Sequence, residues 1–165
     1  MDYHFYRKNF EEAAEDIFFR QFEDLGLKLS VEEVLQSVAL KIYKPEWSND
    51  FKSQLNSKSR IFFSVWVNDK SIKEGKLYYN IHALKLRELK GYKISSRNFA
   101  GIFRNKFIEY QKEWKNVDVN FGPLTLMEGW IHLNIETIQN DIIDLARNFL
   151  KISPVIDDTL DIFKI

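Results

Sequence analysis

The alternation of apolar and polar residues predicts two neighbouring β-strands in the middle of the chain. Over 60–68 and again over 76–86, every second side chain is apolar, which is the period of a strand with one buried face. A short polar stretch, 69–75, separates the two segments, so we expect them to pair as an antiparallel hairpin. The same alternation returns over 117–121 and 129–135 and predicts two further strands.

Other segments carry apolar residues three and four positions apart, as an amphipathic helix does. Helices are expected over 10–25, 31–43, 96–114, 138–151 and 154–164. Residues that favour helix starts support these assignments. Asn9 with Glu12, and Ser30 with Glu33, have the spacing of a capping box, and Pro154 suits a first helical turn.

One of these segments has a second interpretation. Residues 38–43 also alternate, as a strand would, although the apolar spacing over the whole of 31–43 favours a helix. The polar segment 45–59 that follows fits a short helix or an ordered loop.

Hairpins that alternate with helices are typical of the α+β class. We expect an antiparallel sheet of about four strands, in a β-β-α-β-β-α core packed with helices and preceded by N-terminal helices. A length of 165 residues fits one domain. Within it we expect a helical part over about 9–58, a sheet-containing core over about 60–151 and a closing helix over about 154–164.

The composition excludes several classes of chemistry. The chain has no Cys, which excludes disulfides, thiol nucleophiles and Cys-ligated metals. Glycine-rich phosphate loops, the GxSxG nucleophile motif and the helical HExxH metal motif do not occur. We therefore expect no cofactor and no metal, and the balance favours a protein that is not an enzyme.

The sequence also bears on compartment. The N-terminal segment lacks the apolar run of a signal peptide, and the longest apolar stretches, such as 61–63, are far too short to cross a bilayer. The mean hydropathy of −0.35 agrees. The expectation is a cytoplasmic protein that does not interact with membranes.

Two histidines share the polar side of different predicted strands. If the strands pair suitably, His82 and His132 converge on one face of the sheet with aromatic and amide side chains. The companions are Trp66, Tyr78, Asn80, Trp130 and Asn134. Aromatic walls with a few polar groups describe a ligand pocket, in which either imidazole could act as general acid or base. The alternative is that these side chains are structural.

Charge is unevenly distributed, although 24 basic and 24 acidic residues cancel. Residues 85–115 carry 9 basic and 3 acidic side chains, whereas both ends of the chain are acidic. A site for phosphate or nucleic acid could form on the helix predicted over 96–114, from Ser95, Ser96, Arg97, Arg104 and Lys115. The simpler interpretation, which we favour, is an ordinary charged helix face against which the acidic ends fold.

The loop over 121–130 combines turn residues with apolar ones such as Leu124, Leu126 and Met127. It either covers the core, which we favour, or presents a patch to a partner.

Three functions follow from these features. The first is a small binding or interaction module without catalytic machinery, whose partner is a protein or a small ligand. The second is a ligand binder or enzyme that uses the face with His82 and His132. The third is binding of nucleic acid or phosphate through 85–115.

Overall fold

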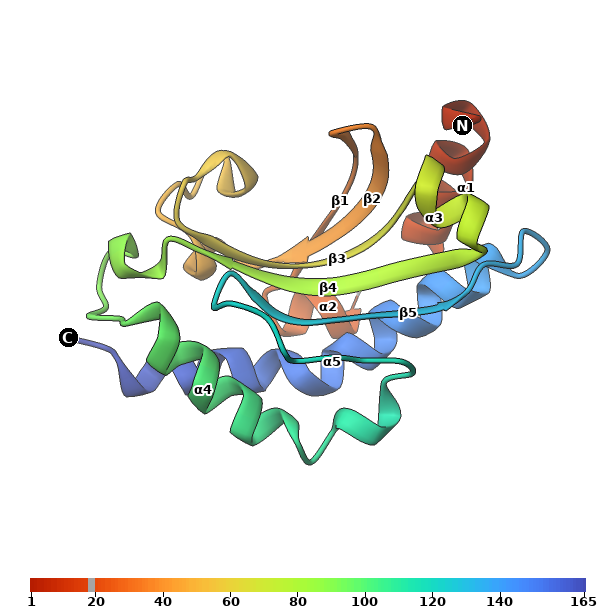
Figure 1. Ribbon diagram of the computed structural model, residues 1–165. Coiled ribbons are helices and arrows are strands. Elements are labelled where there is room, and N and C mark those ends of the chain that lie inside the picture. The colour runs from red at the N-terminus through yellow and green to blue at the C-terminus, as the bar shows by residue number, and fades with distance from the viewer. Residues whose placement is uncertain (18–19) are drawn as a thin grey trace.

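The computed structural model describes residues 1–17 and 20–165. Its centre is one antiparallel sheet in which each strand lies beside the strand that precedes it in the chain (Figure 1). The strands are β1 (Lys28–Val34), β2 (Ser37–Tyr43), β3 (Arg60–Asn68), β4 (Lys76–Leu84) and β5 (Thr125–His132). The predicted α+β class with an antiparallel sheet is confirmed, with five strands rather than about four.

The long helices lie against one face of this sheet. The described helices are α1 (Tyr3–Asp16), α2 (Arg20–Asp24), α3 (Asp69–Glu74), α4 (Ser96–Phe107) and α5 (Ile138–Ile162). Figure 1 shows α4 and α5 beneath the sheet and the β1–β2 hairpin curling upward from it. The upper face is therefore concave, and neither α4 nor α5 covers it. Short 3-10 turns occupy Pro45–Trp47, Gln54–Asn56, Leu86–Glu88 and Gln111–Glu113.

The core lies between the sheet and these helices. Phe63 of β3 stacks on Phe149 of α5, with 4.5 Å between ring centroids, and both are fully buried. Tyr79 of β4 is also fully buried, and its hydroxyl donates to the carbonyl of Lys115 at 2.6 Å. The Tyr79 ring lies directly over Gly129, its partner on β5. A Cβ there would approach Tyr79 Oη to 2.2 Å, so this position requires glycine.

The helix predicted over 31–43 is wrong, because this segment belongs to the β1–β2 hairpin. Leu35 and Gln36 form its two-residue turn with φ of +49° and +65°, the conformation that such tight hairpins require. The strand interpretation of 38–43 was the better one. Residues 37–42 of β2 pair one by one with β3, and the β-branched side chains of β2 favour a pleated surface. The segment 9–58, expected to be helical, thus contributes two of the five strands.

The start of the first helix also differs from the prediction. Asp2 caps α1 by accepting the Phe5 N–H at 3.0 Å, whereas Asn9 lies inside the helix and donates to the Phe5 carbonyl. The predicted helix over 10–25 is divided between α1 and α2, and its residues 18 and 19 lie outside the described part of the chain.

Two further corrections concern the strands and helices after α4. Residues 117–121 form a single bridge, Asp118 with Glu128, because the chain turns at Gly122 and Pro123 before β5 begins. The helix predicted over 96–114 ends at Phe107.

The two helices predicted over 138–151 and 154–164 are one helix, α5, with Pro154 inside it. Pro154 has no N–H for the Leu150 carbonyl, and the Ser153 hydroxyl donates to that carbonyl at 3.3 Å instead. The helix therefore continues past a residue that usually ends one.

Candidate functional site on the open face of the sheet

The strand register arranges the side chains of the upper face in rows across β2, β3, β4 and β5. We call this surface the open face. It comprises Ala39, Lys41, Arg60, Phe62, Ser64, Trp66, Tyr78, Asn80, His82, Glu128 and Trp130. Alternate residues of a strand point to opposite faces, so every one of these positions has neighbours in the chain that face the helices.

The first row is aromatic. Trp66 stacks on Tyr78 with 4.7 Å between centroids and an interplanar angle of 10°. Trp130 lies opposite Tyr78 on β5, and Lys76 Nζ lies 4.4 Å from the Trp130 ring centroid. Three of the aromatic residues predicted to converge therefore lie side by side.

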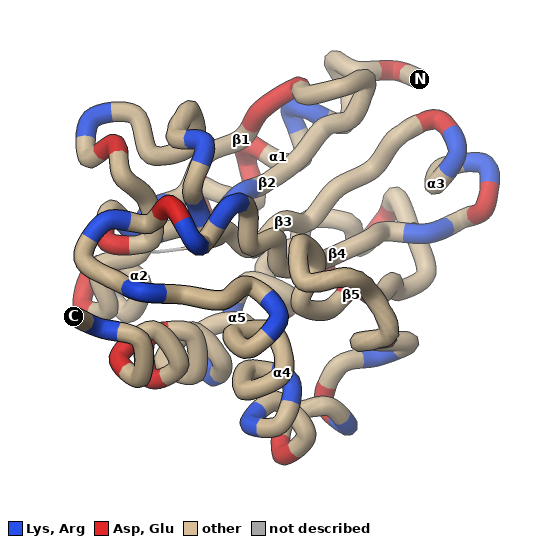
Figure 2. Tube along the Cα trace, turned by 60° about the vertical axis from the view of Figure 1, so that its left-hand side comes forward, with Lys and Arg blue, Asp and Glu red and all other residues tan. Residues whose placement is uncertain are grey.

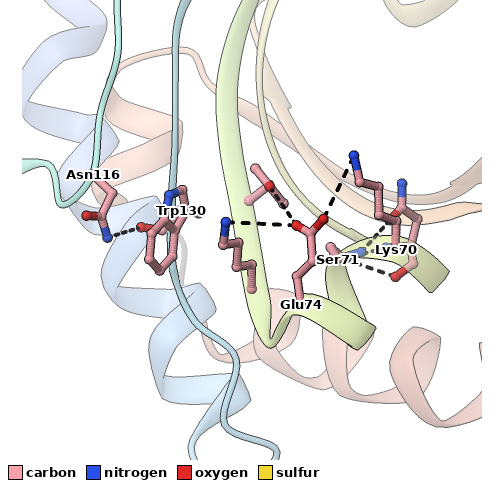
Figure 3. Close-up of polar contacts among 8 residues, drawn as sticks. Lys70, Ser71, Glu74, Asn116 and Trp130 are labelled. Carbon is pink, nitrogen blue, oxygen red and sulfur yellow. Dashed lines mark hydrogen bonds and ion pairs between the residues drawn. The ribbon is translucent and has the colours of Figure 1, made fainter.

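Helix α3 fixes the end of this row (Figure 3). The Tyr78 hydroxyl donates to Glu74 Oε2 at 3.3 Å, and Lys70 and Lys76 lie within 4 Å of the same carboxylate. A capping box between Asn68 and Ser71 starts α3, which places Glu74 beside the strand that follows. The polar stretch predicted as a turn is thus a helical turn that holds the aromatic row.

The second row is polar and buried. Lys41 is only 7% exposed and forms a salt bridge with Glu32 of β1 at 2.9 Å. Asn80 is 2% exposed, and its amide Nδ2 donates to Glu128 Oε1 at 3.2 Å. Among the described residues Asn80 Oδ1 has no hydrogen-bond partner. Leaving such an acceptor unpaired costs on the order of 1–3 kcal/mol, which makes this atom unusual.

The third row carries the imidazole. His82 lies opposite Phe62, with 5.2 Å between ring centroids. Burial lowers the pKa of His82, and the charges of Lys41 and Arg60 lower it further, although a hydrogen bond to the backbone of Leu124 opposes them. The imidazole is therefore neutral at pH 7.

Arg60 stands at the end of this face. Its guanidinium Cζ lies 5.4 Å from the Phe62 ring centroid, and Nη1 donates to the Ser57 carbonyl at 2.6 Å. Arg60 Nε is buried and has no partner among the described residues. Burial lowers the pKa of Arg60, partly offset by the charge of Glu32, but the group remains a cation.

A cavity of about 410 Å³ lies over these rows. The tip of the β1–β2 hairpin, at Val34 and Leu35, bounds one end, and Arg60 with Leu84 bounds the other. Trp66, Asn80 and His82 line it, as do Lys41, Phe62, Ser64 and Glu128. Its size falls in the range of small-molecule sites, and it combines aromatic walls with a few polar groups.

The other predicted ligand residues lie outside this cavity. Tyr78 and Trp130 are beside it in the aromatic row but are not among its lining residues. His132 is exposed at the end of β5 and lines a different cavity of about 610 Å³, next to Trp114 and Lys115. Asn134 lies beyond β5, where its side chain accepts the Glu136 N–H at 3.0 Å. The two imidazoles therefore do not share one cavity.

The residues proposed for anion binding are spread along α4. Ser95 caps the helix by accepting the Asn98 N–H, and Ser96 and Arg97 begin it. Lys115 follows the other end, and a 12-residue helix is about 18 Å long. Figure 2 shows acidic positions between the basic ones of this region.

Arg104, in the middle of the same helix, holds the loop that precedes β5. Its guanidinium donates to four backbone carbonyls at 2.9–3.1 Å, those of Phe121, Gly122, Thr125 and Leu126. These bonds direct Nε and Nη2 of Arg104 to the loop rather than to an external anion. In this loop Leu126 and Met127 are fully buried in the core, whereas Leu124 is half exposed.

Lys41, Arg60 and Glu32 were not predicted as site residues. The helix interpretation of 31–43 concealed Lys41, although a single Lys inside the apolar run of 38–43 was a signal. Arg60 has the parity of Phe62, Ser64 and Trp66 in the strand predicted over 60–68, which was a signal. Glu32 carried none, because only the register of β1 with β2 brings it beside Lys41.

Comparison of the chain with protein-family models, with curated proteins and with solved structures finds no match. Within residues 1–17 and 20–165, no three His, Asp or Glu side chains gather as metal ligands. Across the same residues, every helix is too short or too polar to cross a membrane.

Proposed function

We propose that this protein binds a small organic molecule in the cavity over the open face. The observation that carries the proposal is the side chain of Asn80, a residue that lines the cavity and whose buried Oδ1 lacks a partner among the described residues. A bound molecule that donates a hydrogen bond would remove the cost of this unpaired atom.

The surroundings of Asn80 support the same proposal. Phe62 and Trp66 supply apolar walls, and the rest of the second row is polar. Pockets that orient small molecules usually have this composition. The proposed role is binding rather than catalysis, because the charged neighbours that act on His82 are the cations Lys41 and Arg60. A general base is ordinarily oriented by a carboxylate instead.

The experiment is a fragment screen followed by amide-shift mapping on the whole chain. We expect bound fragments to shift the amides of Ser64, Asn80 and His82 and to leave those of α4 unchanged. Trp66→Ala should abolish these shifts, because Trp66 lines the cavity.

Trp130→Ala is the matched control, since Trp130 lies in the same row outside the cavity lining. Fragments that bind equally to wild type and to Trp66→Ala would contradict the proposal. A screen that yields no fragment on this face would do the same.

A further inference from the structure

The polar residues that line the cavity offer a hydrogen-bond acceptor at Asn80 and a cation at Arg60, and each is complementary to a different group on a ligand. Asn80 Oδ1 can only accept a hydrogen bond, and it is unpaired among the described residues. The complementary ligand group is an N–H or O–H donor. Glu128, beside it, accepts from the Asn80 amide and lines the same cavity, which strengthens the acceptor character of this end.

The end of the cavity at Arg60 is cationic. The Arg60 guanidinium lies 5.4 Å from the centroid of the Phe62 ring, and Lys41 Nζ, which comes from the row of Asn80, lies 4.8 Å from the same centroid. Glu32 pairs with Lys41, whereas none of the described carboxylates forms a salt bridge with Arg60. Arg60 therefore brings a net positive charge to this end, and its buried Nε has no partner among the described residues. A planar carboxylate matches the paired N–H donors of a guanidinium.

The two ends are joined along β3. Arg60, Phe62 and Ser64 are successive residues on the same face of this strand, and Asn80 is the partner of Ser64. Four residues of a strand span about 13 Å, and the Arg60 side chain leans back over Phe62, which shortens the gap. A small molecule that carries both groups could then contact both residues beside the Phe62 ring.

We infer, building on the proposed function, that the ligand is a small aromatic carboxylic acid that also carries an N–H donor, as an N-acylated aromatic amino acid does. Its carboxylate lies at Arg60 and its N–H donates to Asn80 Oδ1. Its ring packs against Phe62 and Trp66.

Three probes test this inference by removing one group at a time. N-acetylphenylalanine carries both groups, N-acetylphenylalanine amide lacks the carboxylate, and O-acetylphenyllactate lacks the N–H. Titrations of the whole chain by calorimetry, with amide shifts to locate binding, should give N-acetylphenylalanine the lowest Kd. Loss of either group should raise the Kd at least tenfold, since a hydrogen bond to a charged or buried group contributes enough binding free energy for a change of that size.

Variants then assign each group to its residue. In Arg60→Gln the acid and its amide should bind equally, whereas Arg97→Gln, an exposed arginine of α4, should keep the discrimination. In Asn80→Leu the N–H and ester probes should bind equally, with the exposed Asn105→Leu as control.

The outcomes separate this inference from the proposed function. Three probes that bind the open face with equal Kd overturn the inference and leave the proposed function standing. The same holds if none of the probes binds while fragments of other chemistry occupy the cavity. If neither probes nor fragments bind there, both fail.

Discussion

The two faces of the sheet are built from alternate residues of the same strands, yet they differ in kind. On the helix side, Phe63 and Tyr79 are fully buried, and the Tyr79 hydroxyl has its carbonyl partner. Their chain neighbours Phe62 and Asn80 face the cavity, and Asn80 keeps an acceptor without a described partner. One face thus has the packing and pairing of a stable core, and the other keeps a buried acceptor that no described residue satisfies.

Phe62 and Phe63 give the sharpest contrast between the two faces, because they are the same residue type at adjacent positions of β3 and face opposite sides of the sheet. Phe63→Ala should lower the free energy of unfolding by about 3–5 kcal/mol, since it empties a space between β3 and α5. Phe62→Ala should cost at most about 2 kcal/mol, because water can enter the cavity that it lines. Urea denaturation at pH 7 measures both. Equal losses would mean that the two faces are equally covered.

The second contrast uses two glycines. Gly129→Ala should destabilise the fold by about 1–3 kcal/mol, because the new Cβ would overlap the ring of Tyr79. Gly101, inside α4, has open space around a new Cβ, so Gly101→Ala should stabilise the protein by up to about 1 kcal/mol. Thermal unfolding of the two variants compares them directly. A Gly129→Ala protein as stable as wild type would show that Tyr79 does not lie over β5.

The third prediction concerns buried polar groups on either side of β4. Tyr79→Phe leaves the Lys115 carbonyl without its donor and should cost about 1 kcal/mol. Asn80→Leu removes an unpaired acceptor and also the hydrogen bond to Glu128. Because these two effects oppose each other, it should change the free energy of unfolding by less than that, in either direction. Chemical denaturation decides between them. A larger loss for Asn80→Leu than for Tyr79→Phe would place Asn80 among the stabilising groups.

The smallest effect is on pH dependence. The pKa of His82 is lowered in the fold, so the unfolded chain takes up the proton first as pH falls. The contribution of His82 to stability is complete above its unfolded pKa, near 6.5, and is lost as pH falls from there toward the lowered value. His82→Asn should therefore lose less stability than wild type between pH 7 and pH 5. His132→Asn, at an exposed position, should follow wild type.

The alternation of apolar and polar residues was sufficient to predict β3 and β4. Their alternation is strong, only a short segment separates them, and β3 has the predicted bounds, 60–68. The pattern also placed Trp66, Tyr78, Asn80 and His82 on one face, since parity along a strand decides that. The position of His132 beyond the cavity depends on where β5 ends, which parity alone does not specify.

The failures have a common cause, which is that distant contacts decide between locally equivalent patterns. The apolar residues of 31–43 satisfy both helix and strand spacing, and pairing with β3 selects the strand. Pro154 suits a helix start, but the Ser153 hydroxyl replaces the missing bond and α5 continues. Arg60 had the parity of Trp66 in the predicted strand, but only the register with β4 shows which groups share the cavity with it.

The order of strands has a consequence for how the protein forms. Because each strand neighbours the previous one, β1 to β4 can assemble during synthesis by successive short-range closures, which are the fast ones. β5 comes only after 40 residues that include α4, and it brings Glu128 to the cavity. The surface that lines the cavity is therefore completed late, when the fifth strand joins the four that precede it.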